Sequence, residues 1–243
     1  MALYQTIFYQ PLFNALVFFY NIMPWSDLGL AIVTLTVVIK LILFPFTVQS
    51  LRSQRALQEL QPKIEELKRR LKDKREQLSK AMMELYKNEK VNPLSSCLPL
   101  LIQLPFLIAV YQVFRSGLNS ESLDLLYPFI NNPGSLNHIS FGFFDLAAPS
   151  PVMAVLAGVA QFFTTKMLIT KKPPPMVRGT EGAKDESMTA MMNKQMQYFM
   201  PIFTIVIGLG LPAGLTMYWF LTTLLTWVQQ LYFFRPKKLS LKT

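Results

Sequence analysis

Residues 195–234 read QMQYFMPIFTIVIGLGLPAGLTMYWFLTTLLTWVQQLYFF and contain no Asp, Glu, Lys or Arg. As a helix rising about 1.5 Å per residue, a stretch of this length would cross a hydrocarbon core of about 30 Å twice. The turn sequence LPAG at 211–214 divides the stretch into two apolar runs. The stretch therefore predicts two membrane spans joined by a tight turn, and it excludes an ordinary soluble enzyme.

Three further stretches of the chain are nearly free of charge. Only 16% of the 243 residues are charged, against roughly 25% in soluble domains. Residues 28–51 hold Lys40 as their only charged side chain, and residues 91–114 and 146–165 hold none. We therefore expect an all-α integral membrane protein with five transmembrane helices, at 28–51, 93–114, 150–170, 196–211 and 212–233.

The basic residues predict the orientation of these spans. The segments 52–90, 166–194 and 235–242 carry 22 of the 24 Lys and Arg residues, and they share one side of the membrane if five spans alternate. Basic loops are retained in the cytoplasm. We therefore expect the C-terminus inside and the N-terminus outside, with a cytoplasmic loop at 171–195 and a cytoplasmic basic tail at 234–243.

Two segments form the expected outer side, at 1–27 and 115–149. Residues 11–23 would make about 20 Å of helix, which is too short to span, so we expect an N-terminal helix lying in the outer interface. A sixth span is the alternative. Residues 125–144 are uncharged but contain Pro, Asn and Gly, which predicts a loop.

Residues 52–92 predict a cytoplasmic helical hairpin between the first two spans. Its apolar residues recur at helical spacing in two arms, with a reversal expected at 72–74. A basic surface of this kind binds anionic headgroups, ribosomal RNA or a protein partner, although a plain coiled-coil connector would show the same pattern. We call it the basic hairpin surface, comprising Lys63, Lys68, Arg69, Arg70, Lys72, Lys74 and Arg75.

Lys40 is the one charge deep within an expected span. A lysine at the centre of a membrane helix costs roughly 2.5–3.5 kcal/mol, and none of the five expected spans holds an acid to pair with it. We therefore expect the ammonium to face water in a hydrated groove. Thr36 lies on the same helix face. Four other polar residues lie deep enough within the expected spans to line the same groove. Each of them alone could instead form a hydrogen bond between two helices. They are Gln103, Gln161, Thr164 and Thr165.

Several sequence blocks resemble the YidC family of membrane insertases, which includes mitochondrial Oxa-type and chloroplast relatives. The resemblance covers roughly residues 8–232, without the large extracytoplasmic domain of Gram-negative members, and Lys40 replaces their usual Arg. A Gln that is common near Thr165 is also missing. The blocks are LQPKI (60–64), MMELYK (82–87), KVNPL (90–94), CLPLLIQLP (97–105), PAGL (212–215), Tyr218-Trp219 and Gln229-Gln230.

The resemblance implies a membrane protein insertase or chaperone of the bacterial plasma (inner) membrane, not an enzyme, with no cofactor. In the family, the first-span cation and its polar neighbours line a groove that opens to cytoplasm and lipid. Thr36, Lys40 and Trp219 stand at matching positions. The implied partners are nascent membrane proteins and the bilayer, with the Sec translocon, ribosome and signal recognition particle as further candidates, and no DNA.

Two other functions compete with this interpretation. A transporter or anion channel would use Lys40 as a substrate site, but such folds usually contain internal repeats, and we find none. An intramembrane enzyme would need a nucleophile and a base within the spans, whereas the only histidine, His138, lies in the expected outer loop. The single cysteine, Cys97, allows no internal disulfide. We expect no catalytic residue and no metal site.

Overall fold

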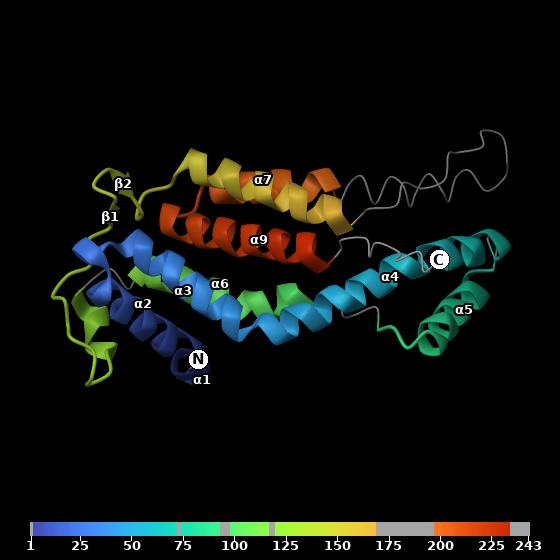
Figure 1. The fold of residues 1–243 in the computed structure, drawn as a ribbon, viewed down its shortest axis with the longest axis horizontal. Helices are drawn as coiled ribbons and strands as arrows, with labels where there is room; N and C mark the ends of the chain where they lie inside the picture. Colours follow the sequence, from blue (N-terminus) through green and yellow to red (C-terminus); the bar gives the residue numbers. More distant parts are fainter. Residues whose placement is uncertain (1, 72–73, 93–97, 117–119, 169–196, 234–243) are drawn as a thin grey trace, which may run out of the picture.

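The computed structural model describes residues 2–71, 74–92, 98–116, 120–168 and 197–233 of the chain. This part is almost entirely helical (Figure 1), as the sequence predicted. Some expectations fall outside the described residues: Lys72, the cytoplasmic loop at 171–195 and the tail at 234–243.

The N-terminal helix is longer than the sequence suggested. The short helix α1 (Ala2–Tyr4), the π-helical turn η1 (Gln5–Tyr9) and α2 (Gln10–Ile22) follow one another without a break. Phe13 and Val17 on one face of α2 are fully buried, and α2 contacts α3 and α6. The α-helix α2 itself has 13 residues, and the interfacial position of the N-terminal helix remains a prediction.

The expected first span at 28–51 is not one straight helix. Its residues divide between α3 (Leu28–Ile42) and α4 (Phe44–Arg70), which meet at an angle of 65°. The physical reason is Pro45 in the first turn of α4, because proline lacks an amide hydrogen and its ring clashes with the preceding turn. By length and hydropathy, none of the described helices could cross a membrane singly, whereas this bent pair could do so when its two parts are taken together.

Helix α5 (Arg75–Asn88) runs back beside the C-terminal part of α4 (Figure 1). Lys63 of α4 forms an ion pair with Glu89, directly after α5. Pro62 lies inside α4. The cytoplasmic hairpin remains a prediction, since residues 72–73 lie outside the described part.

Helix α9 occupies the centre of the helical bundle. It lies between α7 on one side and α3 and α6 on the other (Figure 1), and its Tyr218 is fully buried. Exposed apolar side chains such as Val155 and Val159 cover the outer face of α7. The helix Gln197–Gly208 precedes α9, and the four residues 209–212 separate the two helices. The bounds of these helices are α6 (Leu98–Ser116), α7 (Pro151–Leu168), the helix Gln197–Gly208, and α9 (Ala213–Phe233).

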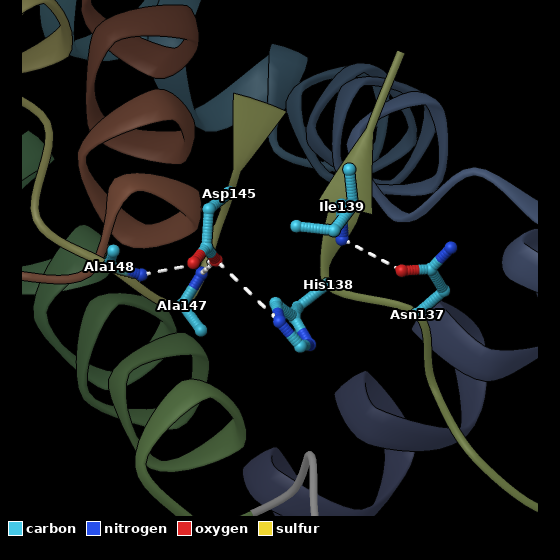
Figure 2. Close-up of polar contacts among 6 residues, drawn as sticks. All are labelled: Asn137, His138, Ile139, Asp145, Ala147 and Ala148. Atoms are coloured by element: carbon cyan, nitrogen blue, oxygen red, sulfur yellow. Dashed lines mark hydrogen bonds and ion pairs between the residues drawn. The ribbon is translucent and has the colours of Figure 1, made fainter. Parts of the chain in front are cut away.

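The expected outer loop contains a small antiparallel hairpin, which follows the short helix η4 (Ser120–Leu125). Its strands are β1 (Ile139–Ser140) and β2 (Phe144–Asp145). Figure 2 shows the contacts around it: the Asp145 Oδ1 atom accepts hydrogen bonds from the amides of Ala147 and Ala148 and lies 4.0 Å from His138 Nε2. The only histidine thus lies in this hairpin region, away from the helical core.

Asp27 joins this hairpin to the start of α3. Its carboxylate caps α3 by accepting from the Leu30 amide at 2.9 Å, and it also accepts from the Ser140 hydroxyl at 2.5 Å and the Phe141 amide at 2.6 Å. Burial raises the pKa of Asp27, but these hydrogen bonds outweigh burial and hold the pKa below its ordinary value. The charged form is therefore the one that stabilises this junction.

We expect Asp27→Asn to lower the free energy of unfolding by about 1–2 kcal/mol at pH 7. Because the folded state lowers the pKa, the carboxylate stabilises the fold above about pH 4 and loses this contribution as the pH falls through the folded-state pKa. Thermal unfolding in detergent at pH 7 and pH 3 checks this, with Asp124→Asn, which changes an exposed aspartate of η4, as the control. A difference in melting temperature that does not shrink at pH 3 would contradict it.

Candidate functional site

The Lys40 ammonium contacts a hydroxyl of α9. Its Nζ atom donates a hydrogen bond to Thr226 Oγ1 at 2.7 Å, and the side chain is partly buried. Lys40 lies in the last turn of α3 because the helix ends at Ile42, and a cation at this end interacts favourably with the helix dipole. Among the described residues, no carboxylate forms an ion pair with Lys40.

The Thr226 hydroxyl is part of a hydrogen-bonded series along α9. It donates to the Thr222 carbonyl oxygen at 2.7 Å. The Thr222 hydroxyl in turn contacts the carbonyl oxygens of Tyr218 and Trp219, each at 2.9 Å. Since a hydroxyl has one proton, Thr226 can only accept from Lys40. The ammonium retains two N–H groups for which the described residues provide no hydrogen bond.

Two more expected groove residues meet α9. Gln103 Nε2 of α6 donates to the Tyr218 hydroxyl at 2.5 Å. The Thr164 hydroxyl of α7 lies 2.9 Å from the Ala160 carbonyl oxygen of its own helix and 3.4 Å from the Thr223 carbonyl oxygen of α9. Helices α3, α6 and α7 therefore each direct one polar side chain to α9. The sequence did not identify the hydroxyl of Thr226 or the partner role of Thr223, although hydroxyl residues in an otherwise apolar helix are a recognised signal of helix–helix contact.

The other expected groove residues bond mainly within their own helices. Thr36 is fully buried and donates to the Ile32 carbonyl oxygen at 2.6 Å. Among the described residues, the hydrogen bond from the ammonium goes to Thr226 and not to Thr36. Gln161 and Thr165 of α7 bond to each other, with the Gln161 amide donating to the Thr165 hydroxyl at 3.3 Å. Trp219 is partly exposed. Their role as groove residues remains a prediction.

Within α4 and near the C-terminal end of α9, three glutamine side chains bury an amide oxygen. The Oε1 atoms of Gln54, Gln229 and Gln230 are buried, and the described residues offer them no hydrogen-bond donor. Arg55 joins the two helices here, because its Nη1 atom donates to the Phe233 carbonyl oxygen at 3.1 Å. Buried polar atoms in proteins nearly always have a partner, which is often water.

The chain matches known proteins over most of its length. Residues 18–240 match the family model described as 60Kd inner membrane protein. The chain is 36% identical to the membrane protein insertase YidC of Haemophilus influenzae, and 36% identical to that of Actinobacillus pleuropneumoniae, over 93% of this chain and 36% of each relative. For Mannheimia succiniciproducens the identity is 37%, over 86% of this chain and 34% of the relative.

The chain thus spans about a third of the length of the curated relatives it matches. These relatives carry the name of the family that the sequence blocks resemble. Because the family model covers nearly the whole chain, this protein belongs to the 60Kd inner membrane protein family.

Proposed function

We propose that this chain is a membrane protein insertase of the bacterial inner membrane and not an enzyme. It moves hydrophilic segments of nascent membrane proteins through a hydrated cationic groove and releases apolar segments to lipid. The observation that carries the proposal is the Lys40 ammonium, which lies among apolar helices with a hydroxyl of Thr226 as its partner and two N–H groups to spare. The YidC insertases among the relatives support this activity.

The groove lowers the cost of moving polar groups through an apolar layer. A polar segment that meets water and hydrogen-bond partners part of the way across avoids much of the desolvation penalty. Lys40 provides a transient partner for acidic groups of the substrate, and the contact must be weak enough for the substrate to leave. We assign the groove to Lys40, Thr36, Gln103, Gln161, Thr165 and Trp219.

Buried amide oxygens support hydration inside the helical bundle. The buried Oε1 atoms of Gln54 and Gln230 need a donor, and water is the simplest one.

In this proposal five spans place the N-terminus outside and the C-terminus in the cytoplasm, with the bent pair of α3 and α4 providing the first span. The distribution of basic residues supports this topology. Exposed apolar residues on α7 and on the helix Gln197–Gly208, such as Val155 and Val206, fit contact with lipid.

We propose the basic hairpin surface as a contact for cytoplasmic partners, including the Sec translocon, the ribosome and the signal recognition particle pathway. Part of its charge is neutralised locally, since Lys63 pairs with Glu89 and Arg70 with Glu66. Lys74 is exposed. An excess of basic over acidic residues in segment 52–90 still favours anionic partners.

The direct test is insertion into lipid vesicles that contain only this protein. We expect a small single-span substrate to insert at least about tenfold more than in protein-free vesicles, as measured by protection of its translocated segment from added protease. Vesicles with heat-denatured protein serve as the control. Insertion equal to that of protein-free vesicles would overturn the proposal. Uptake of a small anion without insertion would instead favour the transporter or channel, which the relatives' names do not support.

A further inference from the structure

We infer that Thr226 is a positioning residue: its hydroxyl holds the Lys40 ammonium against α9 and leaves two N–H groups to meet an acidic group of the substrate. The inference rests on the proposed insertase function and names a residue that sets where the groove cation stands. It depends on the hydrogen bond of 2.7 Å between Lys40 Nζ and Thr226 Oγ1.

The direction of this hydrogen bond is fixed by chemistry. The Thr226 proton is engaged with the Thr222 carbonyl oxygen at 2.7 Å, so the lone pairs of the hydroxyl remain for the ammonium. Donation by Thr226 to a carbonyl makes its oxygen a better acceptor, and a bond from an ionised donor is stronger than a neutral one. The three groups therefore form a polarised series from Lys40 through Thr226 to Thr222.

The hydrogen bond also determines where the charge lies. Lys40 stands in the last turn of α3, two residues before the helix ends, and a long lysine side chain near a helix end can extend toward the membrane interface. Thr226 opposes this movement because it holds Nζ at the contact between α3 and α9. The tetrahedral geometry of an ammonium then turns the other two N–H groups away from Thr226, where a carboxylate can reach them.

The contact at Thr226 is distinct from the other polar links to α9. Gln103 bonds to the Tyr218 hydroxyl and Thr164 to a backbone carbonyl, so changing the Thr226 side chain leaves both donors with their acceptors. Thr204 offers a matched control. Thr204 is buried, and its hydroxyl, like that of Thr226, donates to a carbonyl oxygen of its own helix, that of Met200 at 2.9 Å. It lies outside the proposed groove.

The experiment compares two substrates in vesicles that contain the full chain, one with an acidic and one with an uncharged translocated segment. Thr226→Val removes the acceptor at nearly constant volume, and we expect it to lower insertion of the acidic substrate about tenfold while changing the uncharged one less than twofold. Thr226→Ser should restore insertion, and Thr204→Val should change neither substrate. In a Lys40→Gln background, Thr226→Val should have no further effect. An equal loss for both substrates, no loss, or failure of the serine variant to restore insertion would overturn the inference.

A second measurement does not depend on insertion. A water-soluble acylating reagent followed by mass spectrometry gives the reaction rate of Lys40 relative to Lys166. We expect Thr226→Val to raise this ratio at least threefold, because Nζ is no longer held against α9 and is more accessible to the reagent. An unchanged ratio would overturn the inference. If the parent protein inserted neither substrate, the proposed function would fail, while the Lys40 ratio would still decide the role of Thr226.

Discussion

Lys40→Glu should reduce insertion of a substrate with an acidic translocated segment at least about hundredfold. The ammonium now donates to Thr226, whereas a carboxylate would face a hydroxyl oxygen whose proton is engaged with Thr222. The variant loses a charge-assisted hydrogen bond and also repels the substrate carboxylate. Together these effects are worth roughly 3 kcal/mol, or about two powers of ten.

Two variants separate charge from shape at this position. Lys40→Arg retains the positive charge and should keep most of the insertion activity. Lys40→Gln retains a hydrogen-bond donor without the charge, so its insertion activity should lie between those of Lys40→Arg and Lys40→Glu. Protease protection in vesicles measures all of them, and the melting temperature in detergent identifies any variant that fails to fold. Parent-like insertion by a folded Lys40→Glu protein would remove the electrostatic part of the proposed mechanism.

The helices could be predicted because their apolar composition is a local property of the sequence. The uncharged stretch at 195–234 contains the helix Gln197–Gly208 and α9, and the turn signal at 211–214 lies where α9 begins. Hydropathy did not reveal the bend between α3 and α4, since the apolar residues continue through Leu43. Pro45 causes that bend, but a proline in the first turn of a helix is also compatible with an ordinary start.

The site could be predicted only in part for a related reason. Lys40 stands out in the sequence because it is the single charge in an apolar stretch. Its partner Thr226 is 186 residues away, and their meeting depends on how α3 and α9 pack. The same holds for Gln103 and Tyr218, which are 115 residues apart. Sequence spacing predicts neighbours within one helix, whereas contacts between helices require the fold.

Gly214→Ala should destabilise the fold more than any other single-methyl change we propose. Gly214 lies in the first turn of α9, and an added Cβ would stand 2.1, 2.2 and 2.8 Å from three ring atoms of Phe114. Phe114 is 6% exposed and belongs to the hydrophobic core, so the ring cannot move aside without displacing its neighbours. Overpacking of this kind costs about 2–3 kcal/mol, or roughly 5–10 °C in melting temperature.

Gly210→Ala is the matched control for this prediction. Its Cβ would meet only the Ile207 carbonyl oxygen, at the ordinary contact distance of 3.7 Å, so the melting temperature should stay unchanged or rise slightly, since alanine restricts the unfolded chain. Phe114→Leu should recover part of the loss in the Gly214→Ala protein, because a smaller side chain vacates the space of the ring. Equal melting temperatures for the two alanine variants would contradict close packing between α6 and α9. The Gln103–Tyr218 hydrogen bond joins the same two helices. Close packing at Gly214 therefore also helps to hold Gln103, one of the proposed groove residues, in place beside α9.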